Sequence, residues 1–140
     1  MNLKKRPTTS EDIKWLEPFY ESLMRPYVEL THSWDNTLFK KHFNPEKIVI
    51  LQVNNQDIGA LKVEYHDEFI YLADLVINPN FQNKGIGTRI IKSLIAEAKQ
   101  KSLPIRLKVL KCNPARNLYE RHGFKLIENQ EYSEIFEYKV

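Results

Sequence analysis

The stretch Leu75–Arg89, with the sequence LVINPNFQNKGIGTR, carries the most information on the fold of this 140-residue chain. Its apolar start is stopped by Asn78 and Pro79, which indicates a strand followed by a turn. Beyond the turn, apolar residues recur at helical spacing from about Gly85 to Lys101, which predicts a helix. The chain therefore passes from a strand to a helix through a short loop with glycines at positions 85 and 87.

The start of that helix is a candidate anion site. The first turn leaves backbone N–H groups without partners, and the helix dipole adds positive charge, so a phosphate is favoured there. Gly85 and Gly87 allow close approach to the main chain, and Lys84 and Arg89 add charge at the rim. Tight packing of the helix on the strand is the alternative reason for the glycines. The spacing fits no Walker loop, and Ile90 replaces the third glycine of a dinucleotide fingerprint.

A second informative stretch is Asn113–Phe124, with the sequence NPARNLYERHGF. With the first stretch, it resembles the GNAT superfamily of N-acetyltransferases. The acetyl-coenzyme A motif of that family, Gln/Arg-x-x-Gly-x-Gly/Ala, is met by Gln82, Gly85 and Gly87, and Asn113–Phe124 resembles the second signature, which runs from asparagine through Leu-Tyr to Gly-Phe. The resemblance is specific from about residue 49 to residue 124.

The resemblance implies an α/β (α+β) fold with a mixed, mostly antiparallel sheet of six to seven strands and about four helices. The fourth and fifth strands, Phe69–Ile77 and Ile105–Leu110, are expected to splay apart and admit the pantetheine arm of acetyl-coenzyme A. The diphosphate is then expected on the amides of residues 82–88. The residues assigned to the cofactor in this way are Leu75, Val76, Ile77, Gln82, Asn83, Lys84, Gly85, Ile86, Gly87, Thr88, Asn113 and Asn117.

The remaining elements follow from periodicity and breakers. A first helix, capped by Thr9, is expected to be interrupted by Pro18 and to end before Pro26. The other expected elements are a strand over Leu3–Arg6, a short helix from Asp35 to about Asn44, a hairpin of Lys47–Val53 and Ile58–Tyr65, a helix from Pro114 to about His122 ended by Gly123, and strands over Phe124–Glu128 and Tyr132–Tyr138.

Two residues are the candidate catalytic groups. Tyr119 is expected to give a proton or a hydrogen bond to the departing thiolate, and the alternative is a purely structural ring on a short amphipathic helix. Asp74 is the first candidate for the base, because a carboxylate beside the expected pantetheine site can hold an ammonium or relay its proton. The alternative for Asp74 is an ion pair with a lysine, and the other candidate bases are Glu64 and Tyr71. The resemblance also assigns the oxyanion donor to the Val76 amide.

Other side chains are candidates for contact with the acceptor and for covalent catalysis. Cys112, with His122, suggests a ping-pong route, but a free cysteine at the end of a buried strand more often acts as a small hydrophobe. Asn113 has two candidate roles, binding the pantetheine arm and capping the helix that starts at Pro114. The residues that we expect near the acceptor are Arg25, Tyr27, Glu29, His32 and Trp34, together with Tyr132.

Composition sets limits on the class of protein. Lys and Arg number 21 and Asp and Glu 18, so the net charge of +3 predicts no extended face for nucleic acid. One cysteine excludes an internal disulfide, and four scattered histidines give no metal-ligand spacing. No apolar run reaches the roughly 18 residues of a membrane span, and no signal-peptide pattern is present. We therefore expect one cytoplasmic domain over residues 1–140, without metal, membrane or nucleic-acid partners.

The resulting hypothesis is an N-acetyltransferase that moves the acetyl group of acetyl-coenzyme A, its cosubstrate, directly to a primary amine in a ternary complex. The acceptor is either a small molecule or a protein amino group, and a homodimer is expected from the shape of such proteins. The competing hypothesis keeps the fold and the cofactor but not the chemistry: a catalytically inactive acyl-coenzyme A sensor or interaction module.

Overall fold

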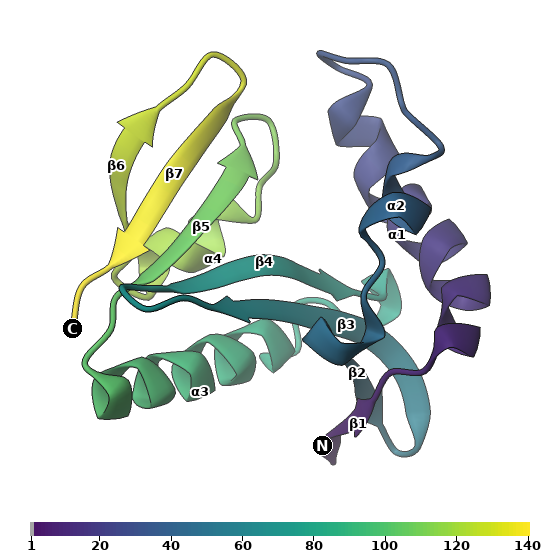
Figure 1. The fold of residues 1–140 in the computed structure, drawn as a ribbon, viewed down its shortest axis with the longest axis horizontal. Coiled ribbons are helices and arrows are strands. Elements are labelled where there is room, and N and C mark those ends of the chain that lie inside the picture. The colour runs from purple at the N-terminus through teal and green to yellow at the C-terminus, as the bar shows by residue number, and fades with distance from the viewer. Residues whose placement is uncertain (1) are drawn as a thin grey trace.

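Seven strands form one sheet in the order β1-β2-β3-β4-β5-β7-β6 (Figure 1). The structure is a computed structural model that describes residues 2–140. The strands are β1 Leu3–Pro7, β2 Ile48–Val53, β3 Gln56–Tyr65, β4 Ile70–Ile77, β5 Ile105–Leu110, β6 Lys125–Asn129 and β7 Ser133–Tyr138, and the helices are α1 Ile13–Val28, α2 Leu38–His42, α3 Ile86–Lys101 and α4 Arg116–Arg121. The expected mixed, mostly antiparallel sheet is confirmed.

The pair β4 and β5 is the one parallel pair among these strands, and it is short. Its register covers only Ile70–Leu72 on β4 and Ile105–Leu107 on β5. Beyond Leu72 the two strands separate, and Figure 1 shows them diverging toward the carboxyl end of β4. The predicted splay is confirmed, and it leaves the main chain of the last part of β4 without a strand on that side.

The two faces of the sheet are covered by different helices. Along β2 the side chains alternate, so that Leu51 and Val53 join the core under α3, whereas Ile48 and Ile50 join the smaller core under α1. Leu16 is the most deeply buried residue of α1. The larger core also includes buried residues of α3, namely Ile86, Ile90, Ile91, Leu94 and Ala98.

Helix α1 corrects the expected effect of its prolines. It continues through both Pro18 and Pro26 and ends at Val28. Each proline lacks the N–H that would reach the carbonyl four residues earlier, on Lys14 and on Ser22. Both of these residues are exposed, so water can satisfy the carbonyls, while burial of the opposite face holds the helix together.

Several predicted turns are confirmed, with small shifts at helix starts. Asn54 and Asn55 both have positive φ and join β2 to β3 in a two-residue hairpin. Gly123, with φ of +93°, ends α4 as expected.

The predicted helix from Pro114 begins two residues later, at Arg116, because a turn closed by the Asn113 side chain occupies its start. The helix expected from Asp35 begins at Leu38 for the same reason: the Asp35 side chain accepts from Thr37 N.

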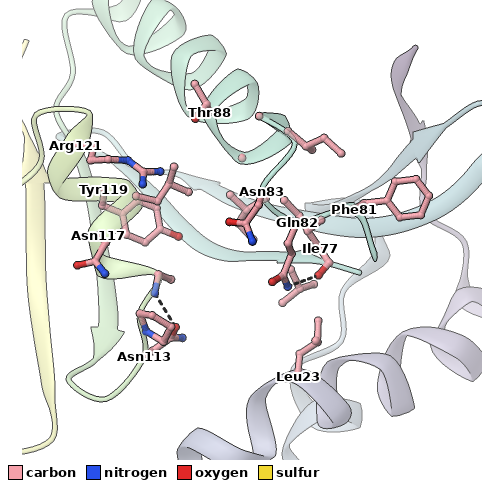
Figure 2. Close-up of a pocket in the computed structure, with 18 of the residues that line it drawn as sticks. Leu23, Ile77, Phe81, Gln82, Asn83, Thr88, Asn113, Asn117, Tyr119 and Arg121 are labelled. Atoms are coloured by element: carbon pink, nitrogen blue, oxygen red, sulfur yellow. Dashed lines mark hydrogen bonds between the residues drawn. The ribbon is translucent and has the colours of Figure 1, made fainter. Parts of the chain in front are cut away.

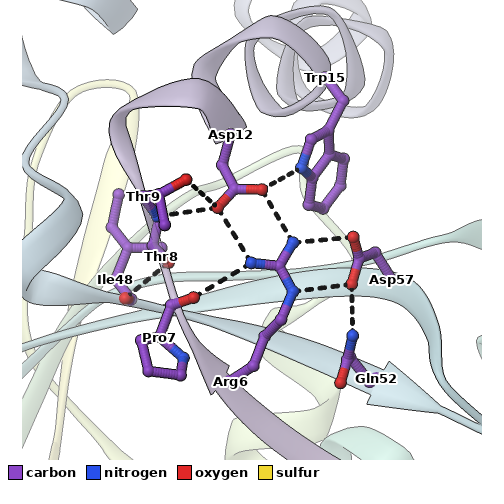
Figure 3. Close-up of polar contacts among 9 residues, drawn as sticks. All are labelled: Arg6, Pro7, Thr8, Thr9, Asp12, Trp15, Ile48, Gln52 and Asp57. Carbon is purple, nitrogen blue, oxygen red and sulfur yellow. Dashed lines mark hydrogen bonds and ion pairs between the residues drawn. The ribbon is translucent and has the colours of Figure 1, made fainter.

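Arg6 ties α1 to the sheet (Figure 3). Its Nη2 lies 2.8 Å from Asp12 Oδ1 and 2.8 Å from Asp57 Oδ2, so one guanidinium joins the start of α1 to β3. Asp12 also accepts from the Thr9 amide and from the Trp15 indole, each at 2.8 Å. The hydrogen bond from Arg6 holds the pKa of Asp12 far below its usual range, although burial opposes this. The network therefore anchors the start of α1 to β1 and β3.

No helix within residues 2–140 combines the length and the apolar character that crossing a membrane requires.

Candidate active site

A cleft of about 450 Å³ opens where β4 and β5 separate (Figure 2). Its walls are the end of β4, the loop after it, the first turn of α3, helix α4 and one face of α1. All the predicted cofactor residues line this cleft except Lys84. The Lys84 ammonium lies instead over the Phe81 ring, 5.8 Å from its centroid. Two stretches of sequence, 75–88 and 113–119, therefore meet at one cavity.

The amides of residues 83–88 form a set of unused donors. The Gln82 amide donates to Pro79 O at 3.2 Å, and the Arg89 amide begins the regular bonding of α3 by donating to Gly85 O at 3.0 Å. Within residues 2–140, no backbone carbonyl accepts from the amides between these two. The expected cradle therefore starts one residue later than predicted, because the turn Pro79–Phe81 closes onto Gln82.

The two loop glycines serve different purposes. Gly85 has φ of +82°, a region that side chains with a Cβ rarely adopt, and it directs the chain into α3. At Gly87 a Cβ would lie 3.1 Å from Leu118 Cδ2 of α4. Close packing therefore explains the glycine at position 87. The expectation named only packing of α3 on the strand, but the nearest neighbour of Gly87 is Leu118 on helix α4. Close packing of α3 on α4 brings both sides of the cleft together.

Two amide side chains on the cleft also hold the main chain. Gln82 Nε2 donates to the carbonyl of Ile77 at 2.8 Å, and Asn113 Oδ1 accepts from the Ala115 amide at 2.9 Å (Figure 2). The expected capping role of Asn113 is not confirmed, because its side chain closes a turn onto Ala115 before α4 begins and the N-cap of α4 is Ala115, which has no side-chain cap. A carbonyl oxygen has two lone pairs, so Ile77 keeps one acceptor position for another donor. Among residues 2–140, no acceptor takes a hydrogen bond from Asn113 Nδ2, so this donor is available to a ligand in the cleft.

Tyr119 combines a buried ring with a hydroxyl on the cleft. The ring is 8% exposed and packs edge-on against Phe124, with 5.7 Å between the ring centroids. Figure 2 shows it extending from α4 into the cleft, across from Asn83 and Gln82. Burial, and then the charge of Asp74, raise the pKa of Tyr119 to about 12. The phenol is therefore protonated at neutral pH and able to donate.

Asp74 lies on β4 beside the cleft, on the face that α1 covers. Burial raises the pKa of its carboxyl to about 6, while Lys62 and the Tyr20 hydroxyl lower it and Glu64 raises it. Lys62 is its register partner on β3, but among residues 2–140 the two form no ion pair within 4 Å. This argues against the simple lysine pairing considered above. At neutral pH the carboxylate is ionised and still basic enough to accept a proton.

Tyr20 is a site residue that sequence reasoning missed. The helical pattern marked it only as one of the apolar positions of α1, yet its hydroxyl interacts with Asp74 and its ring lies 5.3 Å from Phe39 and 6.4 Å from Trp34. Burial raises the pKa of Tyr20 above that of a free phenol. No local signal distinguishes such a tyrosine from a core residue. Other lining residues missed from sequence are Leu23, Met24, Phe81 and Arg121.

The alternative catalytic residues lie farther from the cleft. Glu64 lies on β3, 3.8 Å from Lys47 Nζ, and Tyr71 faces it on β4. Cys112 is exposed in the turn after β5, with Sγ 3.6 Å from Tyr27 O, and it does not line the cleft. The expectation of a buried cysteine is therefore wrong, because β5 ends at Leu110 and the chain turns outward.

Of the residues expected to contact the acceptor substrate, one lines the cleft and the others lie outside its lining. Tyr27 lines the cleft, whereas Arg25 is held on the surface by Glu21, at 2.7 Å, and by Glu29. His32 lies edge-on to Tyr132, with 4.9 Å between ring centroids, and this contact joins the segment after α1 to the β6–β7 turn. Trp34 packs beside Tyr20, and its indole nitrogen is buried without a hydrogen-bond partner in residues 2–140.

Electrostatically, the site has one anionic and one cationic part. Asp74 and the tyrosines around it lie at the β4 side, whereas Arg121 and the free amides of the α3 start lie at the other. Within residues 2–140, no group of three or more His, Cys, Asp or Glu side chains could hold a metal ion. The arrangement suits an anionic ligand at one end and a basic group at the other.

Comparison with solved structures supports the fold. The PaiA N-acetyltransferase from Thermoplasma acidophilum, solved in complex with coenzyme A, is 18% identical and has a TM-score of 0.80, with 100% of both chains covered. An acetyltransferase from Thermus thermophilus is 16% identical with a TM-score of 0.76, covering 100% of this chain and 98% of that one. Arabidopsis thaliana Naa50, solved with the bisubstrate analogue CoA-Ac-MVNAL, is 12% identical with a TM-score of 0.71, again with 100% of both chains covered.

The family model for the acetyltransferase (GNAT) family matches residues 13–124, which include β4, the loop of free amides, α3 and α4. The match therefore spans both sequence motifs and the cleft between them. The chain belongs to the GNAT acetyltransferase family.

Proposed function

We propose that this protein transfers the acetyl group of acetyl-coenzyme A directly to a primary amine. The observation that carries the proposal is the set of unbonded amides of residues 83–88, which faces the same cleft as the Tyr119 hydroxyl. An anionic cofactor and a proton donor are thus provided for on opposite sides of one cavity.

The cofactor is proposed to lie along the cleft with its diphosphate on the start of α3. Helix α3 has 16 residues, and its dipole and free N–H groups favour a diphosphate. Arg121 adds a cation on the α4 side. The pantetheine arm then runs beside the unpaired part of β4, where the main-chain groups of Leu75 and Ile77, which face away from β3, and the Asn113 amide can bind it. The Val76 amide, which the resemblance assigned to the oxyanion, belongs to the hydrogen-bonded pair with Ala60 on β3, so it is not proposed for that role.

The chemistry requires two protons to leave the attacking ammonium. One must leave before attack, and the other leaves when the amide forms, while the sulfur of coenzyme A gains one. Asp74 is proposed to accept the first proton, directly or through water, and Tyr119 to donate to the sulfur. Once Asp74 is protonated, the negative charge that raises the pKa of Tyr119 is gone. The acid therefore becomes stronger at the step in which it donates.

The pKa of Asp74 indicates which amines suit the site. Transfer of a proton from an alkylammonium group with a pKa of about 10.4 to the Asp74 carboxylate, whose pKa is about 6, costs about 6 kcal/mol. The same transfer from an α-amino group with a pKa of about 8 costs about 3 kcal/mol. Among acceptors that fit the cleft, we therefore propose that amines of low pKa, such as α-amino groups, react faster at neutral pH.

The test begins with binding and continues with turnover. Titration with acetyl-coenzyme A should raise the melting temperature by mass action. A panel of amines of graded pKa is then assayed by release of free thiol. If the cofactor binds and no amine is acetylated, the protein is a sensor or interaction module, and the proposed activity is wrong.

Tyr119→Phe tests the proposed acid. We expect turnover to fall tenfold or more, with the dissociation constant of coenzyme A unchanged within about twofold. Tyr138→Phe is the matched control, because its ring packs on Phe124 in the same aromatic cluster but lies outside the cleft lining. Equal turnover in both variants would remove Tyr119 from the mechanism.

A further inference from the structure

His122 connects α4 to the proposed diphosphate cradle. Its Nε2 lies 3.3 Å from the Thr88 hydroxyl, and Thr88 is the third residue of α3 and lines the cleft. The amide of Thr88 is one of the unbonded donors of the cradle. A ring nitrogen of His122 is therefore one hydrogen bond away from the place where a diphosphate would lie.

The position of His122 is set by the turn that ends α4. The His122 amide donates to Tyr119 O at 3.1 Å, and Gly123 then takes a left-handed conformation that returns the chain toward β6. The imidazole is partly buried between α4 and α3. It thus faces Thr88 because of the same turn that holds Tyr119 at the cleft.

The direction of the hydrogen bond depends on the protonation of the ring. In a neutral imidazole, Nε2 is a donor in one tautomer and an acceptor in the other, and as an acceptor it takes the only hydrogen of the Thr88 hydroxyl. In the imidazolium, Nε2 always donates. The Thr88 hydroxyl is then free to donate its own hydrogen to a phosphate oxygen.

We propose that His122 is a positioning residue for the cofactor, and that protonation of its imidazole strengthens diphosphate binding by turning the Thr88 hydroxyl toward the phosphate. This inference rests on the proposed function, because it assumes that the cradle binds the diphosphate of coenzyme A.

The charges around His122 agree with this coupling. The charged groups that act on the ring are Arg121 of α4 and Lys92 of α3, both cationic, and with burial they lower the pKa of His122 in the free protein. The ring is therefore mostly neutral near pH 7. A bound diphosphate brings negative charge close to these groups, which reverses the effect and favours the imidazolium. Cofactor binding then takes up a proton, and by linkage a lower pH strengthens binding.

Dephospho-coenzyme A is the suitable probe for this coupling. The 3′-phosphate of coenzyme A is a phosphomonoester whose second ionisation lies at about pH 6, so its own titration would obscure that of the histidine. The probe keeps the diphosphate, which does not titrate in this range. Calorimetric titration in two buffers of different ionisation enthalpy gives the number of protons taken up per molecule bound.

We expect the wild-type protein to take up a fraction of a proton near neutral pH, and its affinity to rise about five- to tenfold from about pH 8 to about pH 6. His122→Gln, which does not titrate, should lose both effects. His42→Gln, on exposed α2, should keep both. Thr88→Val should also lose the pH dependence, because no hydroxyl remains to be turned.

Two results would overturn the inference. One is equal proton uptake by the wild type and His122→Gln. The other is full pH dependence in Thr88→Val, which would mean that the imidazolium acts without the hydroxyl. An NMR titration of the His122 ring in the wild type, with and without the probe, tests the same coupling without a variant: its pKa must rise on binding. If no probe binds at any pH, the proposed function itself fails.

Discussion

Replacing Asp74 by asparagine should change how the stability of the fold depends on pH. The carboxyl has a pKa of about 6 in the folded protein, against its ordinary value of 3.8, chiefly because burial disfavours the charged form. The folded state therefore holds this proton more tightly than the unfolded state does. As the pH rises from about 4 to about 6, the unfolded state ionises first, and the folded protein loses stability.

The size of the effect follows from the shift. About two pKa units at 1.36 kcal/mol each correspond to a total loss of about 3 kcal/mol, which is spread from about pH 3 to about pH 7 and is steepest between the two pKa values. Asp74→Asn removes the titration. Its free energy of unfolding relative to the wild type should thus increase by about 3 kcal/mol between about pH 3 and about pH 7, while acetyl transfer falls. Asparagine can change hydrogen bonds by a constant amount, so the pH dependence of the difference is the quantity to measure.

Urea unfolding at a series of pH values supplies the measurement. Asp67→Asn, in the exposed turn between β3 and β4, removes the same charge and is the matched control. A constant difference between Asp74→Asn and the wild type over the whole range would refute the reasoning. It would mean that the carboxyl is solvated or paired in solution and is not held ready to accept a proton.

Three further substitutions test the packing that builds the site. Gly59→Ala would place a Cβ 2.2 Å from Val76 O, so we expect loss of more than about 3 kcal/mol in urea unfolding, or no folded protein. Gly87→Ala meets Leu118 Cδ2 at 3.1 Å and should cost about 1–2 kcal/mol, a loss that combination with Leu118→Ala should partly offset in a double-mutant cycle. Asp12→Ala removes the buried carboxylate of the partly exposed Arg6 network and should cost about 2 kcal/mol near neutral pH and progressively less below about pH 4, as judged by unfolding at both pH values.

The extent of α1 shows where local rules stop. Proline was expected to end this helix, yet α1 passes through Pro18 and Pro26, because the carbonyls that lose donors belong to exposed residues. The same limit applies to Gln82, whose amide was expected in the cradle but is bonded to Pro79 O. In both cases the outcome depends on which side of the backbone faces water or a neighbouring turn, and the local pattern does not contain this information.

The sequence predicted the parts of the candidate site that lie in the two motifs and missed the parts that come from other elements. Residues 75–88 and 113–119 were expected at one site because together they resemble the two GNAT motifs, whereas the local pattern alone left the glycines with either a phosphate-binding or a packing role. Tyr20 and Arg121 were missed, since each reaches the site from another element and resembles an ordinary helix residue in sequence. Their roles depend on contacts with Asp74 and with the cleft, which only the folded chain brings together.

By itself, the sequence determined the order and type of the elements, the two motifs, and the helix start whose amides lack partners. These follow from short-range physics: residue periodicity, the breaking of helices and strands, and the geometry of a first helical turn. Only the tertiary structure decided that Asp74 is buried enough to become a weak acid, that Gly87 serves packing against α4, and that His122 faces Thr88. Burial and contact between distant segments depend on how the helices pack on the sheet, so they appear only when the whole chain is folded.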